Sequence, residues 1–237
     1  MTAPPERVLH LVRVRKQYQS LRPLRINELT VDRGERVALS GFDAGAAEVL
    51  VNLVTGASVP DEGEVRVLGG ATTAISDGDA WLASLDRFGI VSPRAVLLDA
   101  ATLLQNLVMP MTLAIDPIPP AMAEAAARLA CEAGIEDRWL PQPIAALPAA
   151  VKARAHLVRA IALDPALLLL EHPTVGLDPP DGQAYGEAVA RVAQPRGLTT
   201  LIVSEDVDFT VAAATRRLAL HAATGELRPP RRRIFGF

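Results

Sequence analysis

Two short runs without charged residues or polar alternation constrain the fold of this chain more than any other feature. They are ALLLL, which ends at Leu170, and TTLIV, which ends at Val203. A strand without polar alternation suits the centre of a parallel sheet, because helices cover both of its faces. Further strands are predicted at VLHLVRV, LRINELTV, RVALS, EVRVL, FGIV and RLALH, with helices at 45–55, 119–133, 149–163, 182–193 and 206–215. Strands that alternate with helices favour an α/β fold with a mixed sheet.

Composition narrows the classes of function. The 237 residues suffice for one sizeable core, and a net charge of −3 gives no electrostatic footprint for nucleic acid, so no nucleic-acid partner is expected. No stretch offers a secretory signal or the roughly 18 uninterrupted apolar residues of a spanning helix, so a cytoplasmic location is expected. Cys131 is the only cysteine and is expected to be a small core residue on a helix. No metal site is predicted.

The stretch LSGFDAGAAEVLVNLVTG, residues 39–56, lies between a predicted strand and a predicted helix, where a phosphate-binding loop belongs. A loop of the form G-x-x-x-x-G-K-[ST] needs glycines, a lysine for the phosphates and a hydroxyl for Mg²⁺. Here Ala47 stands at the lysine position and Glu48 at the hydroxyl position, and only Gly41 and Gly45 keep the loop flexible. The loop has the right place in the sequence without the usual chemical groups.

Four later segments follow this loop in a fixed order: VTGASVPDEGEVRVLGG, FGIVSPRAVLLDAATLLQNL, LPAAVKARAHLVRAIALDPALLLLEHPTVGLDP and LIVSEDVD. Together with the loop, the run from Val8 to Ala222 resembles the nucleotide-binding subunit of ATP-binding cassette (ABC) transporters. The resemblance implies a P-loop NTPase (RecA-like) core with an antiparallel β subdomain and an inserted helical subdomain at about 93–150. It places the domain at 1–228 and leaves a basic C-terminal tail at 229–237.

The resemblance also places this chain's residues at the family's catalytic positions, where each is altered. Pro93 stands at the Q-loop glutamine, Glu171 at the Mg²⁺-holding aspartate, His172 at the catalytic glutamate and Glu205 at the switch histidine. Glu171 could still reach a metal-bound water. His172 could act as a base or be a structural histidine. No catalytic residue is assigned.

The residues that would contact a nucleotide are those of the altered loop and the adenine position: Tyr18, Gly41, Gly45, Ala47, Glu48 and Val49. Losing the lysine and gaining Glu48 each cost about 4 kcal/mol, against about 8 kcal/mol for a micromolar site. ATP with Mg²⁺ is therefore expected to bind weakly, and no cofactor is assigned. Tyr18 either stacks on adenine or packs at a strand end. Glu48 either favours the first helical turn or places its carboxylate on the free N–H groups of its own helix.

The signature motif of the family is also altered, to Leu147, Pro148, Ala149, Ala150 and Val151. Pro148 removes the hydroxyl that would face a γ-phosphate, although the helix start keeps its N–H groups. The D-loop aspartate, Asp178, is intact and in the family contacts the dimer partner.

The resulting prediction is a catalytically degenerate cassette, a pseudo-ATPase, peripheral on the inner face of the cell membrane. It would dock an integral membrane permease or pair with a second cassette, as a homodimer or a heterodimer. The apolar residues Leu103, Leu104 and Leu107 are expected to form the docking surface. The alternatives are a divergent but active ATPase that uses Glu171 and His172, and an ATP- or ADP-sensing module without hydrolysis. The arginine-rich tail is either solvated or in contact with anionic lipid headgroups.

Overall fold

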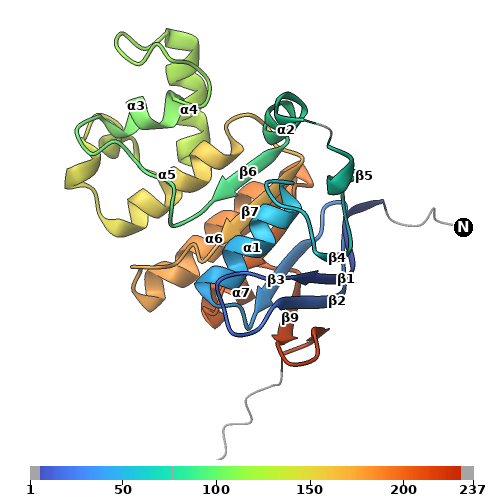
Figure 1. Ribbon diagram of the computed structural model, residues 1–237. Helices are drawn as coiled ribbons and strands as arrows, with labels where there is room; N and C mark the ends of the chain where they lie inside the picture. Colours follow the sequence, from blue (N-terminus) through green and yellow to red (C-terminus); the bar gives the residue numbers. More distant parts are fainter. Residues whose placement is uncertain (1–5, 76, 231–237) are drawn as a thin grey trace, which may run out of the picture.

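Two β-sheets organise the chain in the computed structural model, which describes residues 6–75 and 77–230 (Figure 1). The larger sheet has the strand order β10-β9-β3-β8-β7-β6, and all its neighbours are parallel except β10 and β9. Its strands are β3 (Arg36–Ser40), β6 (Phe88–Val91), β7 (Leu167–Glu171), β8 (Thr199–Val203), β9 (Arg216–His221) and β10 (Glu226–Arg228). The smaller, antiparallel sheet has the order β2-β1-β4-β5, with β1 (Arg7–Lys16), β2 (Leu24–Asp32), β4 (Glu62–Val67) and β5 (Gly70–Ala71). The predicted tail at 229–237 lies almost entirely outside the described residues.

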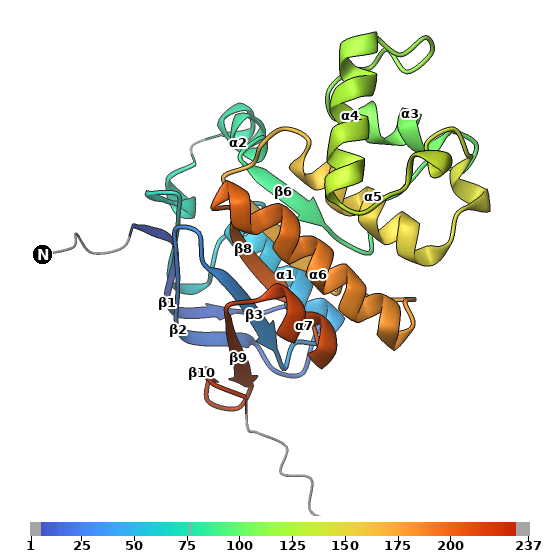
Figure 2. The ribbon, with the colours of Figure 1, turned by 180° about the vertical axis from the view of Figure 1, so that it is seen from behind.

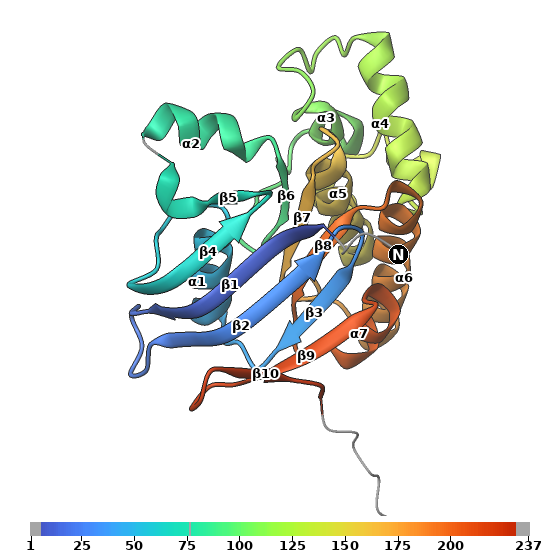
Figure 3. The ribbon, with the colours of Figure 1, turned by 90° about the vertical axis from the view of Figure 1, so that its right-hand side faces the viewer.

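Helices cover both faces of the larger sheet, with α1 on one face and α6 and α7 on the other (Figures 1 and 2). Helices α3, α4 and α5 gather at one end of the molecule, away from the antiparallel sheet (Figure 3). The helices are α1 (Ala44–Val54), α2 (Gly78–Leu85), α3 (Leu103–Val108), α4 (Pro120–Glu132), α5 (Ala149–Ile161), α6 (Pro179–Arg196) and α7 (Val207–Ala213). Across the described ranges, we find no helix with the length and apolar character needed to cross a membrane.

The central strands β7 and β8 are buried along their whole length, as their apolar runs predict. Successive side chains of β7 point to opposite faces of the sheet. Leu168 and Leu170 pack with the helical side of the core, whereas Leu167 and Leu169 pack with α1 and the antiparallel sheet. The strand thus joins the two halves of the core.

The segment between β6 and α5 forms a small helical layer with its own buried residues. Thr102 and Gln105 cap α3 reciprocally, and the buried Asn106 side chain accepts from Leu98 N at 2.8 Å. Leu103 and Leu107 have no exposed surface and Leu104 packs against them. The expectation that these three leucines form a docking surface is therefore wrong, because they hold α3 onto the core.

Cys131 lies on α4, as expected, but its side chain is exposed. The expectation of a core position is wrong, because the buried face of α4 is formed by Ala126 and Ala130 instead.

Candidate functional site

The loop between β3 and α1 is closed by the chain's own aspartate. Asp43 is the N-cap of α1, and its Oδ1 accepts a hydrogen bond from Ala46 N at 2.7 Å. Its carbonyl oxygen accepts from Ala47 N at 2.9 Å. A carboxylate at this place satisfies the free donors of a helix start and its positive dipole end. The idea that Glu48 does so is wrong, because Asp43 caps the helix and Glu48 turns towards Arg94.

A second carboxylate lies on the opening of the same loop. Glu205, at the predicted switch position after β8, accepts hydrogen bonds from Gly41 N at 2.6 Å and Phe42 N at 3.1 Å. Gly41 has φ +86, and a Cβ there would lie 2.7 Å from the carbonyl oxygen of Leu220, so this turn requires glycine. Four N–H donors of the loop are therefore used by the chain itself.

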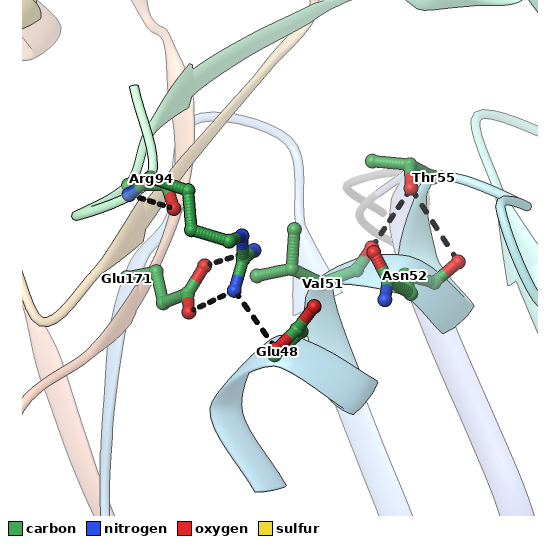
Figure 4. Close-up of polar contacts among 7 residues, drawn as sticks. Glu48, Val51, Asn52, Thr55, Arg94 and Glu171 are labelled. Carbon is green, nitrogen blue, oxygen red and sulfur yellow. Dashed lines mark hydrogen bonds and ion pairs between the residues drawn. The ribbon is translucent and has the colours of Figure 1, made fainter. Parts of the chain in front are cut away.

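Arg94 provides the cation of this site (Figure 4). Its Nη1 and Nη2 donate to the two carboxylate oxygens of Glu171 at 2.9 and 2.7 Å. Nη1 also lies 3.3 Å from Oε2 of Glu48. Glu171 is almost completely buried, with 3% of its side chain exposed, whereas Arg94 is 46% exposed.

These contacts test whether the site fits Mg²⁺ and a nucleotide triphosphate. Both oxygens of Glu171, the residue predicted to reach a metal-bound water, are engaged by a guanidinium. Ala47 offers no ammonium group and is fully buried, and Glu48 brings a second carboxylate to the same guanidinium. The residues present do not fit a Mg²⁺–triphosphate group.

His172 has a strained backbone and an unused ring nitrogen. Its φ is 41, and its N donates to the Val203 carbonyl oxygen at 2.8 Å. Among the described residues, its buried Nε2 has no hydrogen-bond partner. A general base must reach the proton that it removes, and a buried Nε2 is poorly placed to do so.

A cavity of about 330 Å³ brings together Pro93, Ala149 and His172, three of the predicted site positions. Lys152 and His156 of α5 also line it. Burial lowers the pKa of His156, and the neighbouring charge of Arg159 lowers it further. The cavity therefore joins the predicted Q-loop, signature and Walker B positions.

Tyr18 lies against the loop at Gly45. A Cβ at Gly45 would be 3.1 Å from the Tyr18 ring, so glycine allows the ring to approach the loop closely. The ring also packs against the core formed by α1 and the antiparallel sheet. Tyr18, Gly41 and Asp43 line a second cavity, of about 300 Å³. The contacts of the ring with the core support the packing interpretation.

The remaining predicted positions lie at helix starts. Pro148 is the N-cap of α5 and makes no side-chain capping bond, and Leu147 before it is buried. Ala149 and Ala150 begin the helix. Asp178 is the exposed N-cap of α6 and likewise makes no side-chain capping bond.

Two residues of the site were missed by sequence reasoning. Asp43, three residues before Ala46, matches the pattern of a helix N-cap, so a signal for it was present. Arg94 gave no such signal, because its main partner, Glu171, is 77 residues away in the sequence.

Comparison with known proteins supports the resemblance to the nucleotide-binding subunits of ABC transporters. No protein-family model matches the chain. It is 30% identical over 209 residues to the lipoprotein-releasing system ATP-binding protein LolD 1 of Rhodospirillum rubrum, covering 86% of this chain and 92% of that protein. It is 28% identical over 213 residues to the methionine import ATP-binding protein MetN of Brucella abortus, covering 90% of this chain but only 57% of the relative's length.

Solved structures agree on the fold. The dimeric bacterial ABC transporter cassette MJ0796 superposes with a TM-score of 0.74 at 22% identity, over 97% of this chain and 100% of that one. CbiO1 of Clostridium perfringens gives a TM-score of 0.77 at 19% identity, over 94% of this chain and 87% of that one. The architecture is that of an ABC ATPase cassette, and the predicted fold class is confirmed. The chain belongs to the ATP-binding cassette family of ABC transporters.

Proposed function

We propose that this chain is a catalytically degenerate cassette, which serves an ABC transporter complex as a structural and coupling subunit. The observation that carries the proposal is the internal pairing of the nucleotide site. Asp43 and Glu205 hold the loop's N–H groups, and Arg94 holds Glu171. Phosphoryl transfer relies on positioning and charge stabilisation of the phosphates, and these groups are directed at one another instead.

The proposed partner is an integral membrane permease, with a second cassette as a further partner. The relatives carry names of import and release systems. A groove of about 230 Å³ lies between β6 and α5, lined by Ile90, Pro110 and Leu163 among others. Val96 and Leu98 are 71% and 49% exposed on the loop after β6. Clustered exposed apolar residues are typical of an interaction site. We propose that a short apolar segment of the permease docks here. The chain would then lie on the cytoplasmic face of the membrane.

The purified protein is expected to bind Mg-ATP more weakly than about 100 μM, because the lysine is absent and Glu48 adds repulsion. Phosphate release should not exceed that of a His172→Ala control. Competition against a fluorescent nucleotide measures the affinity, and a phosphate assay at millimolar Mg-ATP measures turnover. Turnover that His172→Ala abolishes would establish the divergent ATPase. Low-micromolar binding without turnover would contradict the expected weak affinity and favour the sensing module.

Docking is expected to depend on the exposed apolar residues Val96 and Leu98, which follow the groove-lining residue Ala95 in the chain. Val96→Asp and Leu98→Asp should move the chain from sedimented membranes of its source cells to the supernatant, because a buried carboxylate opposes apolar contact. The matched control is Val211→Asp, at a residue 57% exposed on α7. Quantitative blotting of both fractions gives the readout. If the Val96 and Leu98 variants stay bound while truncation after Arg228 releases the protein, the tail is the anchor and the assignment of the docking surface fails.

A further inference from the structure

The Arg94 guanidinium joins three parts of the chain that are distant in sequence. Glu48 comes from the first turns of α1, Glu171 from the end of β7, and Arg94 from the segment that leads out of β6 (Figure 4). Without a cation between them, the two carboxylates would repel each other. Glu171, at 3% exposure, would also be a buried charge without an ionic partner among the described residues.

The geometry suits an arginine in particular. The planar fork donates to both oxygens of Glu171, which is the strong bidentate arrangement for a carboxylate. A lysine would supply a single point charge and could not form this pair. Arg94 N also donates to Ser92 Oγ at 3.2 Å, which fixes the local turn.

The loop after β6, which carries Arg94, is also bonded to α5. Arg159 of α5 donates to the carbonyl oxygen of Val96 at 2.7 Å. The loop after β6 is thus bonded to α1 and β7 through Arg94, and to α5 through Arg159. Among the described residues, the ion pairs of this loop with α1 and β7 are those of the Arg94 guanidinium.

We propose that Arg94 is a resident cation of this site, which takes over the roles of the metal ion and the loop lysine. It holds α1, β7 and the start of the helical segment in one arrangement without any ligand. This proposal rests on the proposed function in one respect, because it treats the loop before α1 as a degenerate nucleotide site. It follows that the wild-type protein has no use for a divalent cation here. Removing the arginine should leave two converging carboxylates, and carboxylate oxygens are the ligands that hard divalent cations prefer.

The test is the thermal unfolding of the nucleotide-free protein with and without Mn²⁺ or Mg²⁺. Arg94→Ala should lower Tm by roughly 5–10 °C, since it leaves Glu171 buried and unpaired. Arg94→Ala with Glu171→Gln should recover most of that loss. The matched control is Arg15→Ala, because Arg15 is 44% exposed like Arg94 but pairs with Glu62, which is 62% exposed. Its Tm should fall by less than about 3 °C.

The cations supply the second readout. Millimolar Mn²⁺ should raise the Tm of Arg94→Ala by a few degrees, on the order of the shift for a ligand at many times its Kd. It should leave the wild type and the variant that combines Arg94→Ala with Glu48→Gln unchanged.

Two outcomes would overturn the proposal: an Arg94→Ala variant that melts together with Arg15→Ala, or a wild type that Mn²⁺ stabilises as much as the variant. If Arg94→Ala does not fold, the combination with Glu171→Gln decides: a folded protein supports the proposal and an unfolded one contradicts it. No nucleotide enters these measurements. ATP turnover by the wild type would therefore refute the proposed function without changing this result.

Discussion

Restoring the phosphate-binding loop is expected to strengthen Mg-ATP binding by about 100-fold, while hydrolysis stays at background. The loop-repair variant carries Ala44→Gly, Ala46→Gly, Ala47→Lys and Glu48→Ser. It adds an ammonium group and a hydroxyl and removes the carboxylate that faces Arg94. Competition with a fluorescent nucleotide gives the affinity. Glu48→Gln alone is the control, since it removes the negative charge without restoring the lysine.

Turnover should require further changes, because catalytic groups act as a unit. Pro93, Pro148, His172 and Glu205 still occupy the Q-loop, signature, base and switch positions of the loop-repair variant. A variant that also changes them to Gln, Ser, Glu and His, and that carries Arg94→Ala so that the oxygens of Glu171 are free for Mg²⁺, is the one expected to release phosphate. Clear phosphate release by the loop-repair variant itself would show that Glu171 and His172 already form a competent site, and the degenerate assignment would have to be withdrawn.

Gly89→Ala is expected to destabilise the fold by about 3 kcal/mol, because overpacking against a backbone group has no easy relief. A Cβ on this β6 residue would lie 2.2 Å from the Ala160 carbonyl oxygen of α5 and 2.9 Å from Cγ of Pro165. The helix or the strand must move. Thermal unfolding should show a Tm lower by roughly 6–12 °C.

Gly70→Ala on β5 is the matched control. The nearest atom to its added Cβ, the Val67 carbonyl oxygen, is 3.9 Å away. Both substitutions restrict the unfolded chain alike, so the difference between them reports the contact with α5. Equal melting temperatures would mean that α5 shifts freely against β6.

The sequence predicted the elements whose burial pattern is strong. Strands β7 and β8 are buried throughout, because helices or the second sheet cover both faces. Helix α2 was missed because none of its residues is buried, so no apolar period marks it. Strand β10 was missed because it has only three residues, which are too few to show a pattern.

Rules based on neighbouring residues predict only part of the candidate site, because some of its contacts join residues that are distant in the sequence. The sequence offered a carboxylate on the free N–H groups at the start of α1. A carboxylate is there, but it belongs to Asp43 and not to Glu48. Asp43 is placed by the local chain direction, whereas Glu48 is drawn to a cation that arrives from a distant segment. The Glu171–Arg94 pair depends on how β6 and β7 align in the sheet, and that alignment is a tertiary property.

The capped loop also bears on how the chain persists in a cell. A cassette whose empty loop is completed by a nucleotide gains stability with ligand concentration, by RT ln(1 + [L]/Kd). Here Asp43 and Glu205 complete the loop as the polypeptide folds. If the site is degenerate as proposed, we expect the folded fraction of this chain, and its protection from proteases, to stay the same when the ATP concentration of the cell falls.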